Sequence, residues 1–434
     1  MPLKKLRQNL KSQNLSPTYG QIDQIDQMQL VGSGLNPSIG DIIKILSKES
    51  PLSSFGMVTT IDKSGFTVSP FGFIEGFKIG DILILEEQGL RIPVGNALLG
   101  RVVTPFMEPL DSAGAIAHEQ FNPIMKNPIS PLKRGLIDEI FPTGVKSIDG
   151  LLTCGKGQKM GIFAGSGVGK STLMGMVVRG STAPIKVIAL IGERGREIPE
   201  FIKHNLGDDL TNTVIVTATS DDSALMRKYG AFSAMSVAEY FKDMGHDVLF
   251  MMDSVSRFAM AQREIGLALG EPPTTKGYPP SVFSLLPQLM ERAGKEENKG
   301  SITAFFTVLT EGDDLSDPIA DQARSILDGH IVLSREMTDF GIYPPINILQ
   351  SASRLISSLA TPQHQENIIA YRKMYALLKE NEMLIRIGAY TPGNDHELDL
   401  AISKKPLLEA FISQNANSCI SMQNTLEELF SITR

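Results

Sequence analysis

The chain has 434 residues, of which 42% are hydrophobic and 21% charged, and its formal net charge is −7. At roughly 150 residues per domain, this length indicates about three domains, and the composition is typical of a globular protein, neither disordered nor fibrous. The longest apolar runs are shorter than the roughly 18 residues of a membrane span, and the acidic balance disfavours specific nucleic-acid binding. The N-terminus lacks the continuous apolar stretch of a secretory signal, so we expect a cytoplasmic protein.

The two cysteines, Cys154 and Cys419, lie far apart in the sequence. They predict neither a disulfide framework nor a zinc site, and the sequence assigns no role to either. The six histidines lack the spacing of metal ligands, so we expect them to be structural or surface residues.

The first fifteen residues place Leu3, Leu6 and Leu10 at helical spacing among four basic residues and no acidic ones. This pattern is typical of a short basic amphipathic helix. Two interpretations stay open: a docking segment for a partner or an anionic surface, and a frayed terminus in solvent.

Residues 32–90 predict a first, β-rich domain. Short apolar runs there are separated by Gly, Pro, Ser and Asp, which favours a small antiparallel barrel or sandwich. The next stretch, residues 91–134, carries six prolines, which indicates an extended connection rather than a continuous helix. The predicted strands of the first domain are residues 41–46, 56–61, 66–69 and 81–85.

An α/β domain follows, in which near-continuous apolar strands alternate with helical patterns. This alternation indicates a parallel sheet covered on both faces. Beyond residue 354 the strand pattern ends, and residues 366–387 predict a long helix in a C-terminal α-helical domain. We expect domains over residues 1–90, 91–358 and 359–434. The predicted strands of the sheet are residues 159–163, 185–191, 213–217, 247–252, 302–309 and 330–333.

The strongest motif lies at residues 164–172, directly after the first of these strands and before a helical stretch. It fits a Walker A loop in its required context, although Ala164 stands where the general motif has Gly. Glycines let successive N–H groups face phosphates, and the following helix adds its positive N-terminal end. We expect Lys170 to bind the β and γ phosphates, Ser171 to hold Mg²⁺ and Thr172 to meet the α-phosphate. The predicted nucleotide-binding residues of the loop are Gly165, Ser166, Gly167, Val168, Gly169, Lys170, Ser171 and Thr172.

Two carboxylates follow strands of the predicted sheet, at the edge where ligands bind in such folds. We expect Asp253 to organise Mg²⁺, and the alternative is a cap for the next helix. We expect Glu193 to orient the water that attacks the γ-phosphate. The alternative for Glu193 is a surface ion pair with Arg194 or Arg196.

These motifs and further segments resemble the rotary ATP synthase α/β superfamily. The Gly-Glu-Arg-Gly-Arg-Glu run at 192–197, the Asp-Ser-Val-Ser-Arg-Phe run at 253–258 and the segment at 344–354 all fit the superfamily pattern. The resemblance covers residues 32–354 in the correct order. It implies a RecA-like P-loop parallel-sheet core with a small N-terminal β-barrel and a C-terminal α-helical domain.

Within the superfamily, the chain is similar to the ATPases of bacterial type III protein export, and most of all to the flagellar export ATPases. Residues 192–201, 257–264, 276–280 and 387–401 carry this likeness, and the acidic cluster of rotary β subunits is missing from the C-terminal domain. Flagellar and injectisome systems are not separated by these motifs, because their ATPases share them.

The resemblance implies roles for four residues. Glu193 matches the catalytic glutamate that non-catalytic α subunits lack, and Arg194 would contact the γ-phosphate region. Arg354 matches an arginine finger that reaches the neighbouring subunit's nucleotide, a device worth roughly 10³ to 10⁵ in rate; a local ion pair is its alternative. Tyr343 matches the residue that stacks on adenine, with packing in a turn as its alternative.

The resemblance also implies a function and partners. The chain would hydrolyse ATP with Mg²⁺ as a homohexamer, release export cargo from chaperones and deliver it to a membrane export gate. Expected partners are a stator-like regulator at the N-terminal helix, a central stalk-like protein in the ring, and cargo and chaperones at the C-terminal domain. The protein would lie peripheral to the inner membrane.

Two other functions stay open. An RNA-translocating ring ATPase would share the barrel and the α/β core, but it predicts basic residues beside the aromatic residues of the barrel, and residues 32–90 have few. A nucleotide-binding scaffold subunit with little turnover is disfavoured by Glu193 and Arg354, because such a subunit has no need of catalytic groups.

Overall fold

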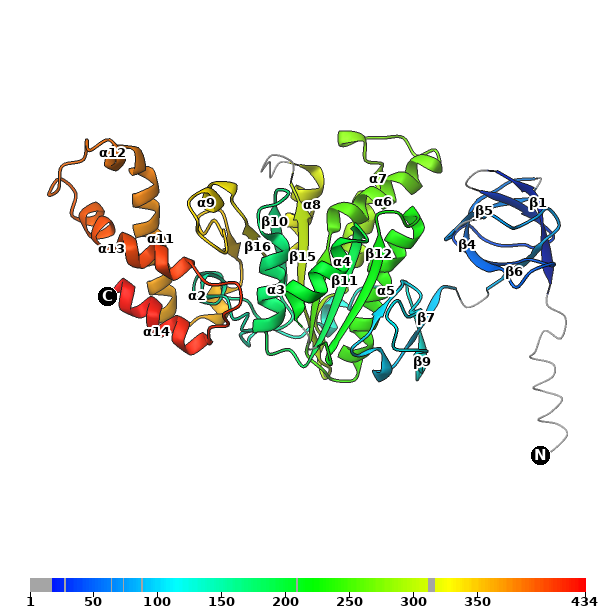
Figure 1. The fold of residues 1–434 in the computed structure, drawn as a ribbon, viewed down its shortest axis with the longest axis horizontal. Helices are drawn as coiled ribbons and strands as arrows, with labels where there is room; N and C mark the ends of the chain where they lie inside the picture. Colours follow the sequence, from blue (N-terminus) through cyan, green and yellow to red (C-terminus); the bar gives the residue numbers. More distant parts are fainter. Residues whose placement is uncertain are drawn as a thin grey trace, which may run out of the picture.

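The computed structural model describes residues 18–26, 29–63, 65–72, 74–86, 89–207, 210–310 and 317–434. The basic helix expected within the first fifteen residues lies outside these ranges. Within them, every helix is too short or too polar to span a lipid bilayer. The barrel lies at one end of the molecule, the α/β core in the middle and the C-terminal helices at the other end (Figure 1).

Six antiparallel strands close the N-terminal barrel in the order β1-β2-β5-β4-β3-β6. Ile43, Ile45, Val58, Val68 and Leu83 fill its interior with fully buried side chains, as the two-residue period of a half-buried strand requires. The first two strands were not predicted, because Gln, Asp and Gly interrupt their apolar alternation. The strands are β1 (Tyr19–Ile25), β2 (Leu30–Ser33), β3 (Ile42–Leu46), β4 (Ser53–Ile61), β5 (Phe66–Pro70) and β6 (Ile82–Leu85).

The proline-rich stretch after the barrel holds more structure than the extended connection that we predicted. It contains short strands and two single-turn 3-10 helices, and the strand β8 (Val102–Val103) pairs in parallel with the core sheet. Three short strands escaped prediction because each has four residues or fewer. The other elements of this stretch are β7 (Arg91–Val94), η1 (Asn96–Leu98), β9 (Gln120–Pro123) and η2 (Pro131–Lys133).

A nine-stranded, mostly parallel sheet forms the core, with the order β17-β16-β10-β15-β13-β11-β12-β8 and β14 paired to β15. All six predicted strands are present, so the α/β prediction is confirmed. Two short antiparallel strands, one paired to β15 and one to β16, were not predicted. The strands are β10 (Lys159–Ala164), β11 (Ile185–Glu193), β12 (Thr213–Thr219), β13 (Val248–Asp253), β14 (Gly294–Lys295), β15 (Ser301–Leu309), β16 (Gly329–Val332) and β17 (Ala352–Ser353).

Helices cover both faces of this sheet. Along β11, Val187, Ala189 and Ile191 join one buried cluster, whereas Ile188 and Leu190 join the other. The first cluster is completed by α5 (Ala224–Asp243), α6 (Val255–Ala268), α7 (Pro280–Met290) and α8 (Pro318–Ile326), and the second by α2 (Lys146–Leu151) and α3 (Lys170–Gly180). Shorter helical turns are α4 (Glu197–Phe201), η3 (Ile202–Leu206), η4 (Thr275–Gly277), α9 (Arg335–Asp339) and α10 (Ile356–Leu359).

The C-terminal part is helical, as predicted, but the long helix expected over residues 366–387 is two helices. It breaks at Asn381, which ends α11 (Pro362–Glu380) and precedes α12 (Glu382–Arg386). The Thr361 hydroxyl accepts a hydrogen bond from the N–H of His364 and so caps the start of α11. Two further helices, α13 (His396–Ile412) and α14 (Met422–Thr433), complete this part and pack into the same buried cluster as α3.

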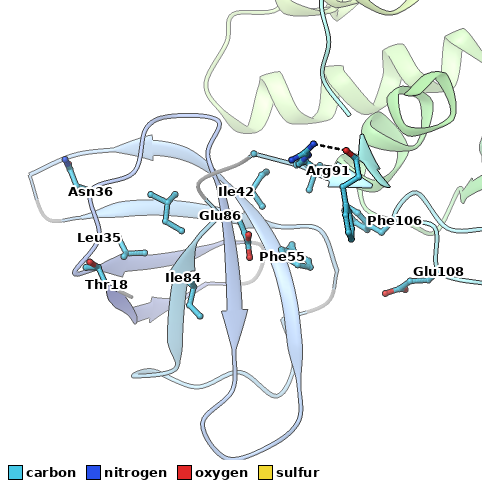
Figure 2. Close-up of a pocket in the computed structure, with 14 residues that line it drawn as sticks. Thr18, Leu35, Asn36, Ile42, Phe55, Ile84, Glu86, Arg91, Phe106 and Glu108 are labelled. Carbon is cyan, nitrogen blue, oxygen red and sulfur yellow. Dashed lines mark hydrogen bonds between the residues drawn. The ribbon is translucent and has the colours of Figure 1, made fainter. Parts of the chain in front are cut away.

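The barrel meets the core through a small contact and a large cavity. The Ser223 hydroxyl donates to the carbonyl oxygen of Phe71 at 2.6 Å, and the rings of Phe71 and Phe106 lie 5.3 Å apart. Beside this contact is a cavity of about 980 Å³ between the barrel and the first turns after it (Figure 2). Arg91 at its edge donates to the carbonyl oxygen of Phe121 at 2.7 Å. The cavity contains no predicted catalytic residue, so it is not the nucleotide site.

Candidate nucleotide-binding and catalytic site

The Walker A residues form the turn between β10 and α3 and line a second, smaller cavity of about 350 Å³. Gly167 (φ +77°) and Gly169 (φ +101°) have left-handed backbones that glycine tolerates without strain. Gly169 caps α3 without any side-chain hydrogen bond, so the first N–H groups of the helix are available to an anion. The buried Val168 side chain anchors the loop in the core. The loop thus has the form that phosphate binding requires.

Lys170 lies between two carboxylates at this turn. Its Nζ hydrogen-bonds Oδ1 of Asp253 and is 3.6 Å from Oε1 of Glu193. Burial alone would lower the pKa of Lys170, but the charges of Asp253 and Glu193 raise it above its ordinary value. The lysine is therefore a fixed cation, which phosphate oxygens could take over from the carboxylates.

Asp253 ends β13 as a buried carboxylate. The Thr307 hydroxyl on the neighbouring strand β15 donates to Oδ1 of Asp253 at 2.8 Å. The helix-cap alternative is wrong for Asp253, because Ser254 is the N-cap of α6 and its hydroxyl accepts from the N–H of Arg257. The carboxylate of Asp253 therefore faces the site rather than capping the helix. Thr307 supports it and is a residue that the sequence analysis missed.

Glu193 ends β11, where the pairing with β12 shifts register after Ile191. Gly192 has a positive φ of 74°, and a Cβ on it would lie 2.8 Å from Cβ of Arg257, so only glycine fits this turn. Burial raises the pKa of the Glu193 carboxyl, and the charge of Lys170 opposes that rise. Arg194 does not pair with Glu193: it is 65% exposed and lies 3.2 Å from Glu197. A surface ion pair with Arg194 therefore does not explain Glu193.

Arg257 is another residue of the site to which the sequence analysis assigned no role. It lines the cavity with Glu193 and the loop, and its buried Nε has no hydrogen-bond partner among the described residues. Its position four residues after Asp253, at the start of α6, is the signal that could have found it, since the first turn of that helix faces the same edge of the sheet.

The two remaining predicted residues lie apart from this cluster. Tyr343 is 51% exposed, and its carbonyl oxygen accepts from the N–H of Gln414 at 2.7 Å. It is close to the loop through Pro345, whose Cδ would lie 3.7 Å from a Cβ on Gly169. Arg354 is not among the residues that line the nucleotide cavity, and one of its guanidinium nitrogens donates to the carbonyl oxygen of Arg324 at 3.3 Å. Neither Tyr343 nor Arg354 lines the nucleotide cavity of this chain, and only the neighbour of Tyr343 in sequence, the segment at Pro345, comes near the loop.

The donor set at the loop suits Mg²⁺. Ser171 and Asp253 carry the oxygen atoms that would hold it, and oxygen is the ligand type that this hard cation prefers. No group of three or more His, Cys, Asp or Glu residues capable of holding a metal occurs in the described ranges. That finding is compatible with Mg²⁺, because sites that bind it with a nucleotide take one or two carboxylates and complete the shell with phosphates and water.

Comparison with known proteins identifies the family. The nucleotide-binding domain of the ATP synthase alpha/beta family matches residues 144–353, and the T3SS EscN ATPase C-terminal domain matches residues 360–431. The flagellum-specific ATP synthase of Helicobacter pylori (strain ATCC 700392 / 26695) is 64% identical over 435 residues, which covers 100% of both chains. This chain belongs to the family of flagellar and type III secretion ATPases.

Solved structures of this family share the whole architecture. The assembled ATPase EscN from the enteropathogenic E. coli type III secretion system is 45% identical, with a TM-score of 0.89 over 96% of this chain and 100% of that one. A second structure, 44% identical with the same TM-score and coverage, holds EscN in complex with its central stalk EscO. The barrel, the P-loop core and the C-terminal helices are thus one family arrangement.

Proposed function

We propose that this chain is the ATPase of flagellar protein export, which hydrolyses ATP to drive type III secretion of flagellar components. The likeness to the flagellum-specific ATP synthase over the full length of both chains supports the biological role. The cluster of Lys170, Asp253 and Glu193 beside the Walker A turn carries the chemistry. Cargo release from chaperones and delivery to a membrane export gate would be the work that hydrolysis performs.

Each residue of the cluster has one task. Lys170 leaves its carboxylates for the β and γ phosphates of ATP, while N–H groups of the loop bind the remaining phosphate oxygens. Bound Mg²⁺, held by Ser171 and Asp253, would neutralise charge on the phosphates. Glu193 orients the attacking water and accepts its proton, and Arg194 and Arg257 meet the γ-phosphate.

The second half of the site would come from a neighbouring copy in a homohexameric ring. Arg354 has only a backbone carbonyl as its hydrogen-bond acceptor among the described residues, so its guanidinium can serve another subunit. As an arginine finger it would stabilise charge in the transition state. Tyr343, half exposed beside the loop, would stack on adenine. The assembled form of EscN supports a ring.

Partners follow from the same assignment. A central stalk-like protein would occupy the ring, as supported by the EscN complex with EscO. A stator-like regulator would bind the N-terminal segment, cargo and chaperones the C-terminal helices, and the ring would lie at the inner membrane as a peripheral protein. No specific nucleic acid is expected: Phe66, Phe71 and Phe77 of the barrel are buried, so they offer no stacking platform for RNA bases.

The first test measures the ATPase rate against protein concentration, together with size in solution, with and without Mg²⁺. We expect wild-type specific activity to rise with assembly and to vanish without Mg²⁺. Arg354→Ala should lose the rate by roughly 10³-fold or more, whereas Arg386→Ala, on the exposed surface of α12, should keep it. A rate independent of concentration and of Arg354 would refute a shared site.

Mixing two inactive variants sharpens this test. Glu193→Gln subunits carry an intact Arg354, and Arg354→Ala subunits carry an intact Glu193. If the finger acts across an interface, a random equal mixture restores both groups at about one site in four. Activity should therefore return on mixing. If each chain completes its own site, the mixture stays inactive. A Glu193→Gln variant with normal turnover would refute the assignment of Glu193 as the catalytic glutamate.

A further inference from the structure

An arginine outside the Walker A motif forms a hydrogen bond with the backbone of the phosphate loop. Arg335, the first residue of α9, donates from one Nη to the carbonyl oxygen of Ser166 at 2.9 Å. The start of α9 is held against the same region by its backbone, since the N–H of Ser334 donates to the carbonyl oxygen of Pro345 at 2.9 Å. Arg335 is therefore positioned by the fold to act on the loop.

This hydrogen bond decides which way one peptide group of the loop faces. In a trans peptide the carbonyl of Ser166 and the N–H of Gly167 point in opposite directions. The hydrogen bond holds the carbonyl of Ser166 toward Arg335. The N–H of Gly167 therefore points in the opposite direction, toward the side where the phosphates would bind. Gly167 has a φ of +77° and no side chain, so its own backbone preference does not fix the orientation of this peptide.

The helix α9 also contacts the C-terminal helices. Oε1 of Glu336 lies 3.1 Å from Nζ of Lys379 on α11, and the same ammonium lies 5.5 Å from the centre of the Phe340 ring. The buried Met337 lies beside Tyr375 at a cavity of about 310 Å³ between α9 and these helices. Figure 1 shows α9 between β10 and the C-terminal helices. A movement of α11 would thus be transmitted to α9.

We propose that Arg335 is a positioning residue that holds the peptide between Ser166 and Gly167 in its phosphate-binding orientation, and that the Glu336–Lys379 pair makes this hold depend on the C-terminal helices. The proposal rests on nucleotide binding at the Walker A loop, as assigned above. It adds a route by which a protein bound to the C-terminal helices changes the affinity for nucleotide without contacting the nucleotide. The route runs from α11 through α9 to the loop.

The experiment measures the dissociation constants of ADP and inorganic pyrophosphate, the KM for ATP and kcat, with the melting temperature as a check on folding. Wild type must bind ADP and hydrolyse ATP; if it does neither, the proposed function fails, not this inference. Arg335→Met should weaken ADP and pyrophosphate equally, by about tenfold, the factor expected for one charge-assisted hydrogen bond. Arg335→Lys, which keeps the charge and a donor, should recover most of that loss.

Three results would overturn the role of Arg335 in the loop. The first is an ADP affinity of Arg335→Met within twofold of wild type. The second is a loss for ADP without a loss for pyrophosphate, which would mean that Arg335 contacts the nucleoside. The third is a fall in kcat at unchanged KM, which would make Arg335 a group for the transition state and not for the loop.

The coupling through the Glu336–Lys379 pair is tested with two matched lysine variants on α11. Lys379→Met should weaken ADP binding two- to threefold. Lys373→Met, on the same helix, removes an exposed pair with Glu397 of α13 and should leave ADP binding unchanged. Combined with Arg335→Met, Lys379→Met should add nothing, because both act through one hydrogen bond. Additive losses, or equal effects of the two lysine variants, would overturn the coupling to the C-terminal helices.

Discussion

The two edges of the nucleotide site differ in how much of it one chain completes. At the phosphate edge, Lys170 is already neutralised by Asp253 and Glu193, and Thr307 supports Asp253 from the next strand. At the arginine edge, Arg354 donates to one backbone carbonyl oxygen and does not line the cavity. Nucleotide binding is thus encoded within one chain, whereas the proposed acceleration of hydrolysis depends on how copies meet.

The contrast is strongest when Lys170→Ala is compared with Arg354→Ala. Both should reduce the rate by roughly 10³-fold or more, but for different reasons. Lys170→Ala leaves Asp253 and Glu193 without their cation beside the phosphates, so ADP affinity should fall as well. Arg354→Ala should keep ADP affinity within a few fold. Fluorescent-ADP titration and steady-state rates separate the two, and equal losses of affinity would erase the difference between the edges.

Arg257 should behave as part of the phosphate edge. Its buried Nε lacks a partner among the described residues, and the side chain lines the nucleotide cavity. Arg257→Met should lower kcat by about 10²-fold, the usual cost of one electrostatic donor in an active site. Arg263→Met, on the same helix but at the η4 turn and outside that cavity, is the control. Similar effects of the two variants would remove Arg257 from the site.

The pH dependence of the rate should report Glu193. Its carboxyl must be ionised to accept a proton, and burial raises its pKa above the ordinary value of about 4.3. The rate should therefore fall about tenfold per pH unit on the acid side, beginning at a higher pH than an exposed glutamate would give. Glu193→Gln should leave a low residual rate without this acid limb. An unchanged limb in Glu193→Gln would assign it to another group.

The smallest effect is on stability, at the start of α2. Asp149 accepts hydrogen bonds from the N–H of Thr143 and of Gly144, and burial raises its pKa to about 6. The folded state therefore keeps a proton that the unfolded chain has lost. The stabilisation is complete below the unfolded pKa and is lost as pH rises through about 6, which amounts to about 1 kcal/mol between pH 5 and pH 7.

Asp149→Asn should remove this pH dependence, since the amide does not ionise. Thermal unfolding at pH 5 and at pH 7 measures the difference, and Asp243→Asn, a half-exposed carboxylate on the core with a lowered pKa, serves as a comparison. An equal dependence in wild type and Asp149→Asn would place the titrating group elsewhere. Asp149 does not line the nucleotide cavity, so ADP affinity should stay unchanged in this variant.

The layered fold and the Walker A loop were predictable because their signals are local. The six core strands are nearly continuous apolar runs, and the loop residues are contiguous between a strand and a helix, so short-range pattern and backbone conformation specify them. Strands β1 and β2 of the barrel were missed since polar residues break their alternation. The break at Asn381 was missed because the apolar period continues across it.

The amino-acid sequence by itself determined the phosphate loop, the strand-ending carboxylates and the family of the chain. Only the tertiary structure decided which distant side chains join them. Thr307 lies 54 residues from Asp253 along the chain, and Arg335 lies 169 residues from Ser166. Neither pairing has a local pattern, because each depends on the order of parallel strands and on the packing of α9 between two domains. Long-range packing thus sets how the loop is held, while local sequence sets what it binds.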